Sequence, residues 1–456
     1  MATSFSEAIS RAPLKAYSVA TFAVCMLVLL CDGMDAQLLG IVAPKVIETF
    51  GVDAGTFGIA MSAALVGFGL GSWGGGWLGD NVGRRWSLAI ATVVFSLATI
   101  GASWASDVWQ MAAWRLIGGL GFGSAYANAI TLAGEWLPDR WRSVGVTTLS
   151  VGTPAGGLVV AALAPTLVDV YGWRGTFVVI GVATLLVVVL ILAFLRDSPS
   201  FLLARGKRDA AQAAARRVLD QDVELEPERH HTDRGGTSIG VFDSSNLRLN
   251  LGVGIAFAAA TMVAYGILSW TTTMLTGKGF SFEQASYAVS VAGLTSIAAS
   301  IAAGLLVQRF GSRVVMATVS ASLLLTLLVL ASQVERLEGT IGDTDQVLVV
   351  ALIGLAAALF SGGIASLYAL MTYGYPSSCR SAGIGFGIFV GRVGAIAATG
   401  LGGALLELGD GSVVPFFAVL CVGAALISAA AFVVDRHVPP ARASKKPAAL
   451  AGSGLS

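Results

Sequence analysis

Charged residues are scarce in this sequence. Asp, Glu, Lys and Arg make up 12% of its 456 residues, whereas soluble domains average about 25%. The net charge of +1 provides no bulk attraction to nucleic acid. Because 55% of the residues are hydrophobic, we expect an integral membrane protein whose surroundings are the lipid bilayer.

Histidine and cysteine are also rare, with three and four residues. His230, His231 and His437 fall in hydrophilic segments, so no histidine relay is expected within the membrane. The cysteines stand in apolar segments without the spacing of metal ligands. No nucleophile–base pair or phosphate-binding loop has a supporting context. We therefore expect no enzyme, no metal site and no cofactor.

Long apolar runs occupy most of the chain. A membrane-spanning helix needs about 20 mostly apolar residues. Twelve runs meet this requirement: residues 18–43, 55–78, 85–105, 108–134, 143–168, 174–195, 249–275, 284–307, 313–333, 346–373, 381–406 and 412–434. The sequence therefore predicts an all-α integral membrane protein with twelve transmembrane helices.

One hydrophilic segment, residues 197–248, divides these spans into six-helix bundles at residues 18–196 and 249–434. A leader at residues 1–17 and a tail at residues 435–456, whose end is expected to be disordered, complete the organisation. The side that holds the leader, central loop and tail carries 22 of the 28 Lys and Arg residues, the other side four, and the spans two. The positive-inside rule then places both termini and the loop in the cytoplasm.

The two halves contain similar motifs. G-W-L-G-D-N-V-G-R-R at residues 76–85 is followed 228 residues later by G-L-L-V-Q-R-F-G-S-R, and P-D-R-W-R-S-V-G at residues 138–145 is followed 238 residues later by P-S-S-C-R-S-A-G. Parallel repeats of six spans place a substrate site near the membrane midplane, between the halves.

Residues 76–85 resemble the loop 2–3 motif of the major facilitator superfamily, G-x-L-x-D-R-x-G-R-R, and depart from it at Asn81. The resemblance implies the major facilitator fold, in which two six-helix repeats alternate access to a central site.

Further stretches resemble the aromatic acid:proton symporters, including benzoate and 4-hydroxybenzoate transporters. They are D-G-M-D-A-Q at residues 32–37, the run R-L-I-G-G-L-G-F-G-S-A-Y-A-N-A from Arg115, Y-G-I-L-S-W at residues 265–270, and residues 375–395. Ala127 and Thr272–Thr273 depart from the family pattern on pocket helices. The resemblance implies import of an aromatic monocarboxylate with a proton across a bacterial inner membrane, and we expect the chain to act as a monomer.

Asp32 and Asp35 lie in the first span, three residues apart and so on one helical face. A charge at bilayer depth costs about 2.5–3.5 kcal/mol on the mildest insertion scale. Two neighbouring carboxylates do not ionise together easily, so one is expected to hold a proton. We interpret them as the proton-coupling pair, with a purely structural role as the alternative; the sequence does not say which one holds the proton.

Arg115 and Arg392 are the two cations within spans. Arg115 lies at a depth that matches Asp32 and Asp35, and it is expected either to pair structurally with them or to help bind substrate. Arg392 has no acid in the apolar part of its own half, and its planar fork matches a carboxylate. It is the leading candidate for the substrate's carboxylate. The four charges sum to zero, and adding one proton and one carboxylate restores zero, which favours symport.

Polar and aromatic residues on the expected pocket helices are further substrate-binding candidates, with packing as their alternative role: Asn128, Tyr265, Trp270 and Tyr368. At the cytoplasmic end, charged residues around the repeated motifs are predicted to form a gate of ion pairs, in which Glu135 pairs with Arg84 or Arg142: Asp80, Arg84, Arg85, Glu135 and Arg142.

Two alternatives stay open. G-T-P-A-G-G at residues 152–157 partly resembles an antiporter motif, which would indicate proton-coupled export of an organic compound, although glycine and proline there also suit close packing. A transporter-like sensor is the second alternative, but such proteins usually have a long signalling extension.

Overall fold

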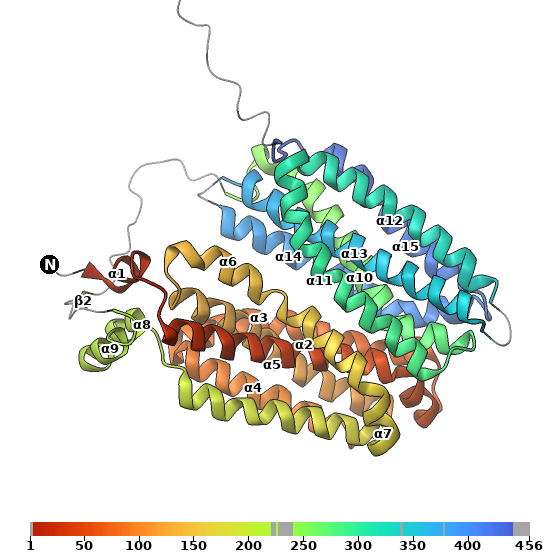
Figure 1. Cartoon of the computed structure of the whole chain (residues 1–456), viewed down its shortest axis with the longest axis horizontal. Coiled ribbons are helices and arrows are strands. Elements are labelled where there is room, and N and C mark those ends of the chain that lie inside the picture. Colours follow the sequence, from red (N-terminus) through yellow and green to blue (C-terminus); the bar gives the residue numbers. More distant parts are fainter. Residues whose placement is uncertain (1–2, 220–224, 227–239, 338–340, 377–378, 441–456) are drawn as a thin grey trace, which may run out of the picture.

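The computed structural model describes residues 3–219, 225–226, 240–337, 341–376 and 379–440 (Figure 1). Long helices dominate it: α2 (Ala16–Phe50), α3 (Ala54–Val82), α4 (Arg84–Ala102), α5 (Val108–Glu135), α7 (Gly152–Phe194), α10 (Leu247–Gly277), α11 (Phe282–Phe310), α12 (Ser312–Glu335), α13 (Asp343–Gly374), α14 (Arg380–Leu408) and α15 (Val414–Val433). The short elements are β1 (Thr3–Ser4), α1 (Phe5–Ser10), α6 (Asp139–Leu149), α8 (Pro199–Ala204), α9 (Arg208–Ala215), β2 (Leu225–Glu226) and η1 (Ser244–Asn246).

Within the described residues, eleven helices are long and apolar enough to cross a membrane. One of them, α7, contains two of the predicted spans, joined at Gly172. The backbone of Gly172 is non-helical, with φ 67° and ψ 172°, a conformation that glycine adopts without a steric penalty. Counting the two parts of α7 separately gives twelve crossings, so the predicted twelve-helix fold is confirmed.

The prediction of one unbroken helix over residues 143–168 is wrong. Helix α6 ends at Leu149, and α7 begins at Gly152 after a turn at Ser150 and Val151. Pro154 lies in the first turn of α7, where its missing N–H leaves no hydrogen bond unmade. The sequence pattern is apolar on both sides of this break, so hydropathy alone did not reveal it.

The leader and part of the central loop are folded at one end of the bundle. Strands β1 and β2 pair in parallel, with Thr3 opposite Leu225, which the all-α prediction did not include. Phe5 of α1 packs on Trp136 with ring centroids 5.6 Å apart. The first part of the central loop forms α8 and α9, whereas most of residues 220–239 and the predicted disordered end of the tail fall outside the described residues.

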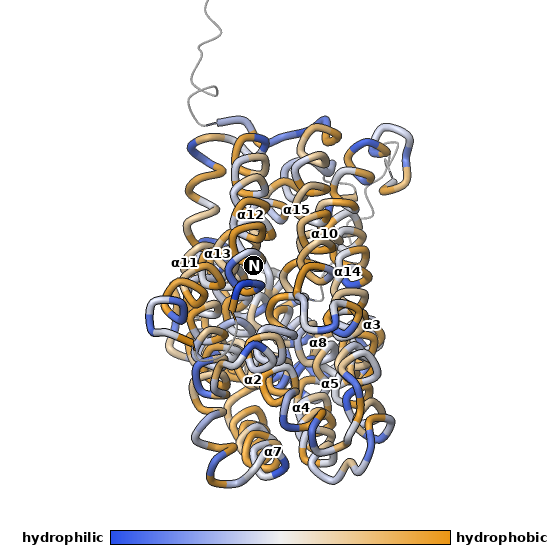
Figure 2. Tube along the Cα trace, turned by 90° about the vertical axis from the view of Figure 1, so that its right-hand side faces the viewer, coloured by the Kyte–Doolittle hydropathy of each residue, from blue (hydrophilic) through white to orange (hydrophobic). Residues whose placement is uncertain are grey.

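The two halves form two bundles that lie side by side (Figure 1). In the first, α3 packs on α5, α2 packs on α7, and α4 contacts both α5 and α7. In the second, α10 packs on α14, α11 packs on α13, and α12 contacts α13 and α15. Figure 2 shows hydrophobic residues along the helices of both bundles, with hydrophilic residues mainly in the turns. This distribution suits helices surrounded by lipid.

The repeated motif gives the same turn in both halves. Gly83 (φ 108°) precedes α4, and Gly311 (φ 85°) precedes α12. In each half the chain beyond the last helix returns to this turn. The Arg85 amide donates to Asp197 Oδ1 at 2.9 Å, and the Ser312 amide donates to the Val438 carbonyl at 3.0 Å. The helix N-termini therefore receive the acceptors that their unpaired amides need.

The halves approach each other most closely at the end opposite α1. The Gly55 amide, at the start of α3, donates to Glu407 Oε1 near the end of α14 at 3.0 Å. One turn further along α3, a Cβ on Gly58 would lie only 2.2 Å from the carbonyl oxygen of Gly400. Figure 1 shows the bundles diverging toward the α1 end. Glycine at position 58 is thus a condition for closing this end.

We predict that Gly58→Val holds the halves apart at the end opposite α1, because its side chain has no space against the α14 backbone. Spin labels at the exposed turn residues Gly51 and Asp410 would report the change as a longer interlabel distance. Gly69→Val is the matched control on the same helix, since nothing lies within 4 Å of that Cβ position. Equal distances in the Gly58→Val variant and the unmodified chain would contradict the prediction.

Candidate functional site

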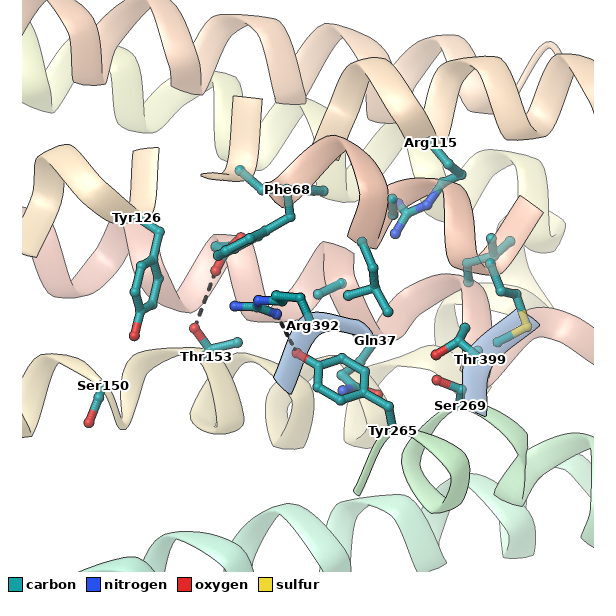
Figure 3. A pocket seen from close by; sticks show the side chains of 18 residues that line it. Gln37, Phe68, Arg115, Tyr126, Ser150, Thr153, Tyr265, Ser269, Arg392 and Thr399 are labelled. Carbon is teal, nitrogen blue, oxygen red and sulfur yellow. Dashed lines mark hydrogen bonds between the residues drawn. The ribbon is translucent and has the colours of Figure 1, made fainter. Parts of the chain in front are cut away.

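A cavity of about 210 Å³ lies between the two bundles (Figure 3). Helices α2, α3, α5 and α7 of the first half and α10 and α14 of the second half line it, together with the turn before α7. Its polar wall residues are Asp32, Gln37, Arg115, Tyr126, Ser150, Thr153, Tyr265, Ser269, Arg392 and Thr399. The sequence placed a substrate site between the halves, and this cavity is where such a site can lie.

Asp35 and Arg115 form an ion pair inside the first half. Arg115 Nη1 lies 2.5 Å from Asp35 Oδ2, and Thr99 Oγ1 donates to Asp35 Oδ1, also at 2.5 Å. Both charged side chains are buried, with Asp35 1% and Arg115 3% exposed. Each charge therefore has a partner, which offsets the large cost of removing it from water.

Asp32 lies one turn earlier on α2 and is equally buried, but its surroundings differ. Its Oδ2 accepts a hydrogen bond from Thr153 Oγ1 at 3.2 Å. Among the described residues no Lys, Arg or His approaches it within ion-pair distance. The Asp32 carboxylate thus has one neutral hydroxyl donor and a cavity wall beside it, whereas Asp35 has a charged partner.

Arg392 reaches the cavity from the second half. Its Nη1 donates to the Tyr265 hydroxyl at 3.1 Å, and its guanidinium carbon lies 3.9 Å from the centre of the Phe68 ring. Figure 3 shows the guanidinium between Phe68 and Tyr265. Within the described residues no carboxylate lies within 4 Å of it. The aromatic ring and hydroxyl orient the fork and leave its remaining donors available for an anion.

Of the other predicted substrate-binding residues, one lines the cavity and three pack between helices. Tyr265 lines the cavity. The Asn128 amide donates to the Gly75 carbonyl, the Ser87 hydroxyl and the Ser124 carbonyl, at 2.8–2.9 Å. The Trp270 indole donates to the Thr399 carbonyl at 3.1 Å, and Tyr368 packs edge-on against Phe257. In this conformation Asn128, Trp270 and Tyr368 lie outside the cavity wall and connect helices.

Several hydroxyl side chains of the site were not among the sequence predictions. Thr99 bonds Asp35, Thr153 bonds Asp32, and Ser269 and Thr399 line the cavity. Serine and threonine occur throughout transmembrane helices and usually bond their own helix backbone. Their presence in the sequence therefore carried no signal, and only their position beside the charges or the cavity distinguishes them.

The glycine- and proline-containing motif at residues 152–157 packs α7 tightly on α2. A Cβ on Gly156 would lie 2.0 Å from the Leu30 carbonyl oxygen, and one on Gly33 would lie 2.0 Å from the Thr153 carbonyl oxygen. This close approach brings Thr153 to Asp32. The packing interpretation of the motif accounts for its glycines, since any side chain there would separate the two helices.

The predicted gate residues gather around the turn between α3 and α4. Arg84 Nη2 lies 2.6 Å from Asp80 Oδ1, and its Nε lies 3.4 Å from Glu135 Oε1, so Glu135 pairs with Arg84. Arg142 contacts Asp139 at 2.8 Å. The Arg85 side chain donates to the Leu192 carbonyl at 2.6 Å. These partners all belong to the first half; an opening and closing role stays a prediction.

Next to this turn lies Asp197, beyond the end of α7. Burial raises the pKa of its carboxyl above the usual range, while the hydrogen bond from the Arg85 amide and the charges of Arg85 and Lys207 oppose the shift. The chain thus places a partly buried acid where the first half of the bundle meets the central loop.

Comparison with known proteins agrees with this architecture. Residues 25–334 match the Major Facilitator Superfamily. The chain belongs to this superfamily. Its members are membrane transporters, so the predicted family and the prediction of a transporter rather than an enzyme are confirmed.

Among the relatives of this superfamily member are aromatic acid transporters. It is 28% identical over 413 residues to the 4-hydroxybenzoate transporter PcaK of Pseudomonas aeruginosa, covering 88% of this chain and 89% of that one. It is 29% identical over 438 residues to a gallate transporter of Pseudomonas putida, covering 94% of each. The predicted resemblance to aromatic acid transporters is confirmed.

Solved structures share the fold at lower sequence identity. A crystal structure of a D-xylose-proton symporter superposes with a TM-score of 0.72 at 16% identity, over 94% of this chain and 99% of that one. An inward open conformation of the xylose transporter XylE from E. coli superposes with a TM-score of 0.70, also at 16% identity, over 91% and 95% of the two chains. These similarities establish the fold.

We predict that Asp35→Asn lowers the melting temperature of the detergent-purified protein, because it leaves Arg115 buried without a counter-ion, a change that costs about 3–5 kcal/mol. Asp32→Asn is the matched control one turn away, and it should melt close to the unmodified protein, since Asp32 is not ion-paired. The double variant Asp35→Leu with Arg115→Met should recover stability. Equal melting temperatures for the two Asn variants would show that the Asp35–Arg115 pair is not structural.

Proposed function

We propose that this chain is a proton-coupled symporter that imports an aromatic monocarboxylate across a bacterial inner membrane by alternating access. The observation that carries the proposal is the guanidinium of Arg392, which faces the cavity with a ring on one side and a hydroxyl on the other, and which no carboxylate of the described residues approaches. A buried cation in this state is favourable only if an anion or water meets it. A substrate carboxylate supplies the planar, bidentate acceptor that its fork fits.

An aromatic acid suits the rest of the wall. Phe68, Phe122 and Tyr126 supply ring surfaces beside the charges, and aromatic pairs gain about 0.5–1.5 kcal/mol beyond area burial. The names of the relatives support the same class, since they include transporters of 4-hydroxybenzoate, gallate and 3-(3-hydroxy-phenyl)propionate.

Coupling to a proton follows from the charges of the cavity. Asp35 and Arg115 neutralise each other, which leaves Asp32 on the first half and Arg392 on the second. A proton on Asp32 and a carboxylate on Arg392 together leave no net charge, whereas either alone leaves one charge in a poorly solvated cavity. The protein with neither ligand bound and the protein with both the proton and the carboxylate bound are thus the forms that change most readily between the two access states.

The cycle then has a definite order of events. A proton binds Asp32, the carboxylate binds Arg392 between the two bundles, and the bundles rock so that the site is exposed at the other side. The gate residues Asp80, Arg84, Arg85, Glu135 and Arg142 open and close the α1 end. The distribution of Lys and Arg supports a cytoplasmic position for this end and for both termini. We propose that the transporter works as a monomer, because the cavity between the bundles is built by two halves of the same chain.

Uptake into proteoliposomes tests the proposal. With an acidic exterior, the purified chain should accumulate labelled 4-hydroxybenzoate, and an uncoupler should abolish the accumulation because it removes the proton gradient. Empty liposomes are the control. Reversal of the flux, so that the acid leaves with the gradient imposed in the same direction, would indicate a proton antiporter instead.

The variant that isolates coupling is Asp32→Asn, which keeps the side-chain shape but cannot release a proton. We expect it to lose accumulation driven by the gradient while it retains exchange of labelled for unlabelled substrate. Full concentrative uptake by Asp32→Asn would remove Asp32 from the coupling mechanism. If Asp35→Asn alone showed the loss with exchange retained, the proton would belong to Asp35.

Arg392 is tested by its effect on substrate affinity. Charge-assisted hydrogen bonds contribute about 1.5–3 kcal/mol each, so Arg392→Gln should raise KM by on the order of 100-fold. Arg392→Lys should give a smaller increase, because it keeps the charge and loses the planar fork. Arg336→Gln is the control, because Arg336 follows the end of α12, outside the predicted spans and the cavity wall. An unchanged KM in Arg392→Gln would exclude Arg392 as the carboxylate site.

A further inference from the structure

Two hydroxyl side chains, Ser269 and Thr399, line one end of the cavity. Thr399 of α14 is 3% exposed, and no described residue hydrogen-bonds its Oγ1. Ser269 of α10 is 9% exposed and lines the same part of the wall. Figure 3 shows the two side chains beside each other, apart from the guanidinium of Arg392.

Among the described residues, the buried hydroxyls of Thr272 and Thr273 on α10 also have no partner, but of these three threonines only Thr399 lines the cavity. Other threonines of α10 bond their own helix. Thr261 Oγ1 donates to the Phe257 carbonyl at 2.9 Å, and Thr271 Oγ1 donates to the Ile267 carbonyl at 2.6 Å. Such a bond to the preceding turn is available to any helical threonine. A buried hydroxyl that does not make it carries a desolvation penalty of about 1–3 kcal/mol. Thr399 thus presents an unmet hydrogen-bonding capacity to the cavity.

The positions of these hydroxyls relative to Arg392 follow from helix geometry. Thr399 is seven residues after Arg392 on α14, which is two turns, or about 10.5 Å along the same face. Ser269 is one turn after Tyr265 on α10, on the same face as that residue. The hydrogen bond between Arg392 and Tyr265 joins the two helices at one level, and Ser269 and Thr399 lie at the next.

This second level is the closed end of the cavity. A Cβ on Gly40 would lie 3.1 Å from the Ser269 carbonyl oxygen, and Gly400 packs beside Ser62. The two hydroxyls are therefore enclosed by the helices that meet at the end opposite α1. A molecule whose carboxylate binds Arg392 can reach them with its far end, because all three side chains line the same cavity.

We propose that Ser269 and Thr399 form a second subsite, which hydrogen-bonds a hydroxyl group on the substrate ring opposite its carboxylate. The subsite rests on the proposed function, and it narrows the substrate class to hydroxylated aromatic monocarboxylates with the hydroxyl at the far side of the ring. A substrate hydroxyl can both donate and accept, so it satisfies Thr399 Oγ1. An analogue without the hydroxyl leaves that atom buried and unpaired, and a site of this kind rejects it for that reason.

The test compares 4-hydroxybenzoate with benzoate as competing substrates in proteoliposomes. The unmodified protein should favour 4-hydroxybenzoate in kcat/KM by on the order of tenfold. Thr399→Val should remove most of this preference while benzoate transport continues, because valine has the same shape without the hydroxyl. Thr399→Ser should restore the preference, and Ser269→Ala should reduce it.

Thr271→Val is the matched control, since that threonine already bonds its own helix and lies outside the cavity wall; it should retain the preference. Equal transport of both acids by the unmodified protein, or an unchanged preference in Thr399→Val, would overturn the subsite and leave the proposed function standing. Absence of transport for both acids would overturn the proposed function and the subsite with it.

Discussion

The cost of placing charge in a low-dielectric, water-poor environment constrains this protein more than any other interaction. Four charged side chains, Asp32, Asp35, Arg115 and Arg392, lie deep within the predicted spans, and each needs a partner, a proton or a ligand. The fold satisfies two of them permanently, through the pair of Asp35 and Arg115 inside the first half. It leaves Asp32 and Arg392 facing a cavity, one on each half. We propose that this asymmetry, with one pair closed and the other open to the cavity, is the physical basis of the transport site.

Asp32 and Arg392 belong to different halves of the chain, so the distance between them depends on how the two bundles are positioned. The halves meet closely at the end opposite α1, where glycines allow α3 and α14 to approach to backbone contact. Any rocking motion about this region changes the separation of Asp32 and Arg392, whereas the Asp35–Arg115 distance belongs to one rigid bundle. In the proposed mechanism, occupancy of the cavity and the relative position of the bundles therefore influence each other, as alternating access requires.

The internal repeat produces the same arrangement at one end of each bundle. In both halves a glycine with positive φ starts the third helix, and the chain beyond the sixth returns to supply acceptors to its N-terminus. The details differ, since Asp197 provides a carboxylate in the first half and Val438 a carbonyl in the second. The acidic and basic residues of the motif are retained mainly in the first half, where Arg84 gathers Asp80 and Glu135.

The sequence by itself determined the twelve spans, the repeat, the family and the four charges of interest, because apolar length and a charge within it are visible residue by residue. Only the tertiary structure decided that Arg115 pairs with Asp35 rather than Asp32, that the fifth span breaks at Ser150, and that Asn128 and Trp270 connect helices. The tertiary structure also decided which hydroxyl groups lie beside the charges or the cavity. In the sequence, Thr99, Thr153 and Thr399 do not differ from other helical threonines. Pairing depends on distances between helices far apart in the chain, and hydropathy contains no information about those distances.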